Sequence, residues 1–265
     1  MGKDDITREH FRSPLLKNVV IRIDYSEITN FEGLIQTMLP FLKSYFVERG
    51  KYTTNNINVT ISEKELANER VPISVLPPNE VYRFTSSNIM PVQVVALDVA
   101  NTFACLIIDC DENYEKIDRY IELVSEVMAK IMEYDAYTTI KRIAIRKIDS
   151  KFFDSLEAAK QVFSNVEQPG ANHPGMDTYQ YRITSFMLNQ ATGTQVNLSR
   201  TYNITDDGKY QVDLDIDGYI GIDKFLQQIN NQESVSQTLF SINELLFEFF
   251  KQNVTELFLN KGLKG

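Results

Sequence analysis

The sequence predicts an α+β fold with a mostly antiparallel sheet in two meander-plus-helix halves and helices packed on one face. The first observation behind this is that two blocks, 82–133 and 179–251, each read as three strands followed by a helix. The second is the pair Asp207-Gly208 between two alternating segments, which is a strong hairpin signal. The third is the spacing of apolar residues at three and four in the helical segments, which is typical of helices that cover a sheet.

The chain divides into three expected parts. Residues 1–149 form an N-terminal α/β half with a central strand–helix–strand block. Residues 150–178 form a connecting helix and loop, and residues 179–265 form a C-terminal meander plus helices. The order of elements is alike in the two halves, but no residue-level repeat accompanies it.

The N-terminal half opens with a strand over 19–25 and a helix that Thr29 or Asn30 can cap. Pro40 predicts a kink or a break in this helix, and Gly50 is placed as the glycine that follows its end. The remaining elements are strands over 57–61, 81–85, 92–97 and 103–108, a long amphipathic helix over 117–131 and a closing strand over 140–148.

The C-terminal half follows a short helix over 152–163. Its elements are strands over 179–188, 195–204 and 210–220, a short helix over 223–229, and a longer helix whose apolar residues run from 239 to 250 and on to 258.

Composition and charge narrow the function classes. The 265 residues are 43% hydrophobic and 24% charged, which is ordinary for a globular protein. The sequence has no long apolar run and no secretory signal, so we expect a cytoplasmic protein with no membrane partner. A net charge of −9 argues against wrapping nucleic acid over the whole surface, although a local basic strand could still bind it. Two cysteines, Cys105 and Cys110, cannot complete a zinc site, and we predict no cofactor.

Three arginines are candidates for an anion site. Arg142 and Arg146 point to the same face of the closing strand, and Arg83 lies on an earlier strand. Guanidinium groups match phosphate or carboxylate, so this set could bind a nucleotide or a nucleic acid. The alternative is structural, with Asp215 and Asp217 pairing with the arginines across neighbouring strands.

Three aspartates are candidates for a metal site. Asp213, Asp215 and Asp217 begin a pattern like that of a calcium loop, but its twelfth position, which requires an acid, is Lys224. The alternative is an exposed or ion-paired acidic strand face, and the sequence favours it.

The last helix carries phenylalanines on more than one face. Phe240, Phe247 and Phe250 are candidates for an oligomer interface, with burial in the core as the alternative. No phosphate-binding loop, nucleophile elbow or zinc-protease motif occurs, so no catalytic residue is predicted.

Four segments resemble one protein family in order and spacing. They are Tyr82–Asn88, the arginine strand Arg142–Asp149, Leu214–Tyr219 and Phe250–Leu259. The family is the sporadically distributed, TIGR-type family of uncharacterised prokaryotic proteins. This chain departs from its pattern with Ala144 for glycine, Lys147 for tyrosine and Asp149 for asparagine. The resemblance implies a bacterial or mobile-element protein of patchy occurrence, and antiviral defence as a setting.

Together these observations favour a non-enzymatic binding or assembly protein, an accessory component of a bacterial defence or mobile-element locus, with a protein partner or a homo-oligomer. The first alternative is a nucleotide- or nucleic-acid-binding protein that uses the arginine strand. The second is a metal-dependent hydrolase that uses the aspartate strand.

Overall fold

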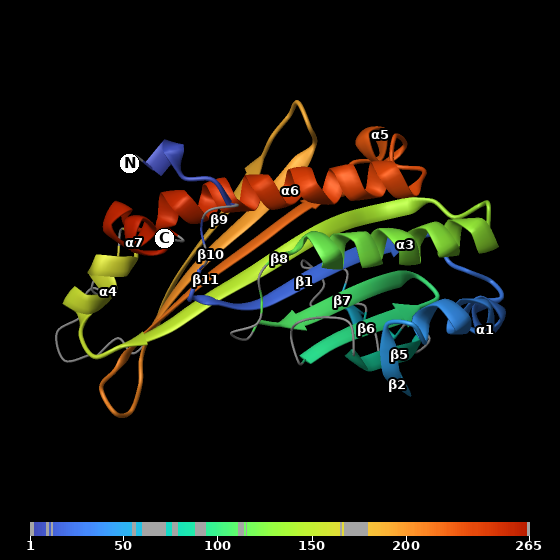
Figure 1. Ribbon diagram of the computed structural model, residues 1–265, viewed down its shortest axis with the longest axis horizontal. Helices are drawn as coiled ribbons and strands as arrows, with labels where there is room; N and C mark the ends of the chain where they lie inside the picture. Colours follow the sequence, from blue (N-terminus) through green and yellow to red (C-terminus); the bar gives the residue numbers. More distant parts are fainter. Residues whose placement is uncertain are drawn as a thin grey trace, which may run out of the picture.

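A nine-stranded sheet with helices on one face dominates the protein (Figure 1). The computed structural model describes residues 3–8, 11, 13–54, 57–59, 73–75, 79–87, 94–110, 114, 116–164, 166 and 180–263. All strand pairs in this part of the chain are antiparallel. The predicted α+β class and mostly antiparallel sheet are therefore confirmed.

The strand order across the sheet is β2-β5-β6-β7-β1-β8-β11-β10-β9. The strands are β1 Leu16–Tyr25, β2 Phe46–Thr54, β5 Asn79–Ser87, β6 Val94–Ala100, β7 Phe103–Asp109, β8 Ile140–Phe153, β9 Gln180–Leu188, β10 Thr194–Ile204 and β11 Tyr210–Ile220. Two short strands, β3 (Ile57–Val59) and β4 (Ile73–Val75), form a separate pair. Two meanders, β5-β6-β7 and β11-β10-β9, thus flank the central strands β1 and β8.

Strand β8 connects the two meanders. Its Ile145 lies opposite Ile21 of β1 on one side and opposite Gly218 of β11 on the other. The strand is 14 residues long and continues past residue 149, where the first part of the chain was expected to end. Of the expected connection 150–178, residues 165 and 167–178 lie outside the described residues.

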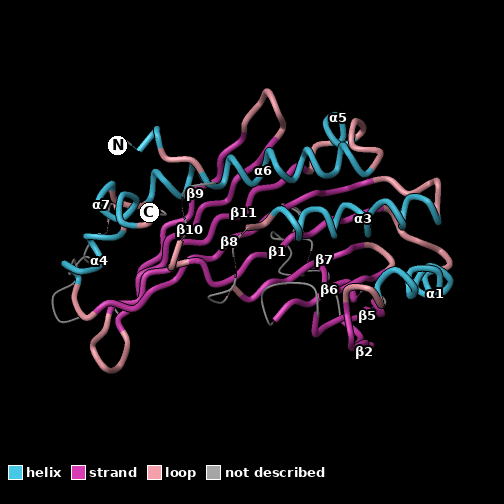
Figure 2. Tube along the Cα trace, in the orientation of Figure 1, coloured by secondary structure: helices cyan, strands magenta, loops and turns pink. Residues whose placement is uncertain are grey.

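Two long helices cover one face of the sheet. Helix α3 (Asp118–Tyr134) packs on β7 and β1, and helix α6 (Gln232–Asn253) packs on β11 and β8. The two helices also contact each other, and Figure 2 shows them in one layer. The main core fills the space between this layer and the covered face of the sheet. No helix within the described ranges combines the length and the apolar character needed to cross a membrane.

The smaller helices lie around this framework. They are η1 (Lys3–Asp5), α1 (Phe31–Leu42), α4 (Leu156–Val162), α5 (Asp223–Leu226) and α7 (Glu256–Lys261). Asn30 caps α1 by accepting a hydrogen bond from the backbone N–H of Gly33, as one of the two predicted caps.

Two helix ends differ from the prediction. Helix α1 continues through Pro40 and ends two residues later, and Gly50 lies inside strand β2 instead of following a helix. The last helix is two helices, because the backbone at Val254 is extended and pairs with Phe163 in a β-bridge. In both places a contact with a distant strand or bridge partner overrides the local helical pattern.

Candidate functional site

The covered face of β8 changes from apolar to charged along its length. Ile143 and Ile145 are fully buried, and by strand alternation Lys147 and Asp149 point to the same side. Both charged residues therefore lie beneath the helix layer, on the opposite face from the arginines.

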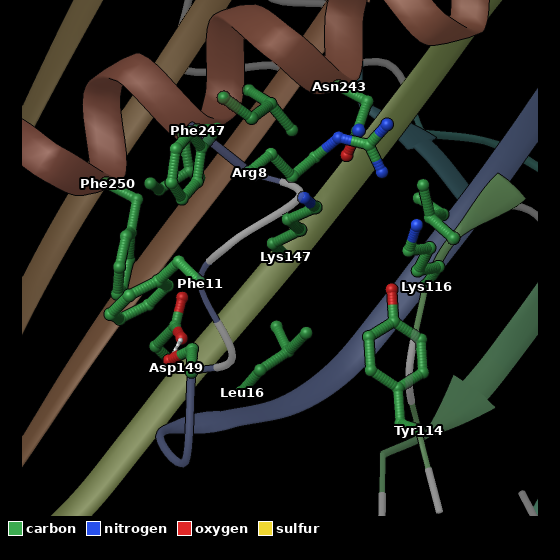
Figure 3. A pocket seen from close by; sticks show the side chains of 14 residues that line it. Arg8, Phe11, Leu16, Tyr114, Lys116, Lys147, Asp149, Asn243, Phe247 and Phe250 are labelled. Carbon is green, nitrogen blue, oxygen red and sulfur yellow. Dashed lines mark hydrogen bonds between the residues drawn. The ribbon is translucent and has the colours of Figure 1, made fainter. Parts of the chain in front are cut away.

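A cavity of about 80 Å³ lies at this position, between β8, helix α6 and the N-terminal segment (Figure 3). That space holds roughly five to eight water molecules, or a ligand of a few heavy atoms. Its lining combines apolar side chains such as Phe247 and Leu16 with polar ones. The main polar residues are Arg8, Ser13, Tyr114, Lys147, Asp149 and Asn243.

Asn243 supplies the cavity with an amide that has no partner. Its side chain comes from the middle of α6, where it interrupts a stripe of buried apolar residues, and 0% of its surface is exposed. Neither Oδ1 nor Nδ2 has a hydrogen-bond partner among the described residues. An unsatisfied buried polar group lowers the stability of the folded protein by about 1–3 kcal/mol, and a ligand that pairs with the amide would remove this cost.

Lys147 supplies a cation without a close counter-ion. Among the described residues no hydrogen bond or ion pair is formed by its Nζ. Burial lowers the pKa of Lys147 to about 8, although the nearby carboxylate of Asp149 acts in the opposite direction. In Figure 3 the amine is directed toward Asn243.

Asp149 supplies a carboxyl group that is 2% exposed. Ser13 donates a hydrogen bond to its Oδ1 over 3.2 Å. Burial raises the pKa of Asp149 to about 7, while Lys147 and the Ser13 hydroxyl lower it. Burial has the largest effect of the three, so the carboxyl group of Asp149 titrates near neutral pH.

The N-terminal segment closes one side of the cavity. Arg8 bridges the two helices of the layer, with Nε 2.6 Å from Glu244 of α6 and Nη1 3.0 Å from Asp118 of α3. Lys3 donates to the carbonyl oxygens of Lys251, at 3.2 Å, and Val254, both near the end of α6. The positive charge of Arg8 is thus already matched by two carboxylates.

The lining of the cavity has an excess of positive charge. Lys116 is exposed at its rim and, like Lys147, forms no ion pair with another described residue. Asp149 is the single carboxylate among the described lining residues. In a protein of net charge −9, this cavity is a local site suited to an anion.

The predicted arginines of β8 lie on the other face and are paired with aspartates. Arg142 Nη2 lies 3.3 and 3.1 Å from the two carboxylate oxygens of Asp217. Arg146 donates from Nε and Nη2 to the two oxygens of Asp215, over 2.8 and 2.6 Å. These are the cross-strand pairs that the sequence offered as the alternative to an anion site.

Arg83 and the remaining aspartate are also partnered. Arg83 donates to both carboxylate oxygens of Asp98 over 2.7 and 2.6 Å, far along the sheet from β8. Asp213 accepts hydrogen bonds from Ser150 and Gln211. Within the described ranges, no three or more His, Cys, Asp or Glu side chains are arranged to hold a metal ion.

The three phenylalanines of α6 have different surroundings. Phe247 and Phe250 are buried within this chain, at 7% and 6% exposure, and their rings pack against Phe11. Phe240 is partly buried against the core. Phe247 and Phe250 therefore line the cavity, which agrees with the alternative of burial in the core, and the oligomer interface stays a prediction.

The sequence contained one signal for this site. Lys147 and Asp149 continue the period-two register of Ile143 and Ile145 and are also two of the departures from the family pattern. Comparisons with protein-family models, curated proteins and solved structures found no match to this chain, so the family resemblance remains a prediction.

Proposed function

We propose that this chain is a binding protein that takes a small, carboxylate-bearing molecule in the cavity between β8 and α6. The single observation that carries the proposal is the buried Asn243 amide. Its two polar atoms lack partners among the described residues, and the Lys147 amine, which lines the same cavity, forms no ion pair there. A carboxylate has two oxygens, and they can accept from the Asn243 Nδ2–H group and from the Lys147 amine. Its negative charge would also offset the charge of the partly buried Lys147 amine.

Both halves of the fold contribute a helix to the layer above the cavity. We infer that the two meander-plus-helix halves are functional units, with α3 from one and α6 from the other meeting above the cavity. A bound anion would then be sensed by both halves at once. The predicted protein partner and the accessory role in a bacterial defence or mobile-element locus are compatible with such a ligand-responsive module.

Two substitutions test the site. Asn243→Leu and Lys147→Met replace the polar groups with apolar ones of similar size. Both should abolish binding of acetate, propionate or butyrate in calorimetric titrations. Each should also raise the free energy of unfolding by about 1–2 kcal/mol, because an unsatisfied buried polar group or cation is removed.

The matched control is Arg146→Gln. Arg146 adjoins Lys147 on the same strand but points to the opposite face, where it is ion-paired with Asp215. This variant should retain the affinity of the unaltered protein. Loss of binding in all three variants, or no binding of any short carboxylate to the unaltered protein, would contradict the proposal.

A further inference from the structure

The cavity carries opposite charges in two places along one strand face. Lys147 and Asp149 are two residues apart on β8, so their backbones are separated by about 7 Å. No ion pair joins them within 4.0 Å, although each influences the pKa of the other. In Figure 3 the amine points toward Asn243, while the carboxyl group lies near Phe11.

Each charged group has unused capacity for hydrogen bonding. The carboxyl group of Asp149 has one side-chain partner among the described residues, the Ser13 hydroxyl, and that bond reaches only Oδ1. Its other oxygen can accept from a ligand. At the other position, Nδ2 of Asn243 is a free donor, and the Lys147 amine forms no ion pair with another described residue.

Much of the remaining lining of the cavity is apolar. Leu16, Phe11, Ile216 and Phe247 are part of it. A ligand that spans the cavity must therefore have polar ends and a short hydrocarbon middle. The volume of about 80 Å³ limits that middle to a few methylene groups.

We propose that the ligand class is a short ω-amino acid zwitterion, with its carboxylate on Lys147 and Asn243 and its ammonium group on Asp149. This inference rests on the proposed function, since it uses the same carboxylate contacts, and it adds a second recognition point. An ammonium group would give Asp149 the counter-ion that the protein does not place within ion-pair distance. A ligand with both charges leaves neither buried group unmatched, whereas a simple carboxylate satisfies one end only.

Calorimetric titration of the full chain tests the second recognition point. The probes are β-alanine, γ-aminobutyrate and δ-aminovalerate, compared with butyrate, which lacks the ammonium group, and butylamine, which lacks the carboxylate. At least one amino acid of the series should bind roughly tenfold more tightly than butyrate or butylamine. In Asp149→Asn this advantage over butyrate should disappear, while butyrate itself still binds.

Asp213→Asn is the matched control for that variant. Asp213 is also an aspartate hydrogen-bonded to a serine, but it lies on β11 and points to the uncovered face of the sheet. This control should keep the preference for the amino acid, and circular dichroism should show both variants folded.

The outcomes separate the two proposals. Equal affinity for butyrate and for every amino acid, or a preference that survives in Asp149→Asn, overturns the zwitterion assignment and leaves carboxylate binding intact. Binding of none of the five probes overturns both.

Discussion

At the scale of single residues, the charged side chains of β8 show that charge in the sequence does not by itself identify a binding site. The conspicuous charges of β8 are Arg142 and Arg146, and both are matched by aspartates of β11. The less conspicuous pair, Lys147 and Asp149, lies under the helices without such partners. Alternation shows which residues share a face, but helix placement decides which face is covered, and that depends on contacts across the whole chain.

Asn243 was not predicted as a site residue, because the sequence pattern of α6 does not distinguish it. Its neighbours Leu239, Ile242 and Leu246 define the buried stripe of α6, and one amide inside such a stripe does not alter the helical pattern. Whether its polar atoms find partners depends on the strand opposite, which no local pattern specifies. Its function as a site residue could therefore not be predicted from the sequence.

Asp149→Asn should change the pH dependence of stability. The pKa of Asp149 is raised from 3.8 to about 7, so between these values the folded protein holds a proton that the unfolded chain releases. The unaltered protein consequently loses stability as the pH rises through this window, and the variant does not. The variant should be more stable by on the order of 1–3 kcal/mol at pH 7.5 and by much less at pH 4. Urea unfolding at the two pH values measures this.

The comparison is internal, and the titrating group that differs besides Asp149 is Lys147, because the Asp149 carboxylate raises the pKa of Lys147. A difference between Asp149→Asn and the unaltered protein that stays constant from pH 4 to 7.5 would contradict the burial of this carboxyl group.

At the scale of elements, the strands were more predictable than the helix ends. The predicted strand over 210–220 coincides with β11, because it alternates strictly and starts after a glycine turn at Gly208, where φ is +77°. Strand β2 was missed, because Val47 and its exposed neighbours have no alternating pattern and only the ladder with β5 makes them a strand. Local pattern identified elements with a buried face, and tertiary pairing created the others.

Packing of α6 on β11 requires close approach at Gly218. A Cβ there would lie 2.7 Å from Leu246 Cδ2 and 3.1 Å from Ile242 Cγ2, and both side chains are buried. Gly218→Ala should therefore lower the free energy of unfolding by about 1–3 kcal/mol. A thermal melt with matched urea titrations measures the loss.

Gly50→Ala provides the control for that substitution. Gly50 also lies in a strand, but nothing lies within 4 Å of a Cβ built there. This variant should be neutral or slightly stabilising, because alanine restricts the unfolded chain more than glycine does. Equal losses in both variants would show that helix packing is not responsible.

At the scale of the whole molecule, the two ends of the chain are joined. Phe11 forms a bridge with Leu263 and packs its ring against Phe247, Phe250 and Phe258. Lys251 Nζ donates back to the carbonyl oxygen of Ile6 over 3.2 Å. The first residues are thus part of the main core and of the cavity wall.

Phe11→Ala should destabilise the protein by about 2–4 kcal/mol, because a buried ring is lost from an aromatic cluster. Phe186→Ala removes a ring that is 76% exposed on β9 and should change the free energy of unfolding by less than about 0.5 kcal/mol. Chemical unfolding of both variants measures the difference. Similar values for the two would mean that the N-terminal segment does not contribute to global stability.

The contacts between early and late residues also determine when the cavity can form during synthesis. Strands β1 and β8 can pair in a nascent chain once residue 153 has emerged, but Asn243 and Phe250 are synthesised much later. Only then can Arg8 contact Glu244 and Lys3 reach the end of α6. The cavity is therefore completed late in translation, because its lining includes residues from Arg8 to Phe250.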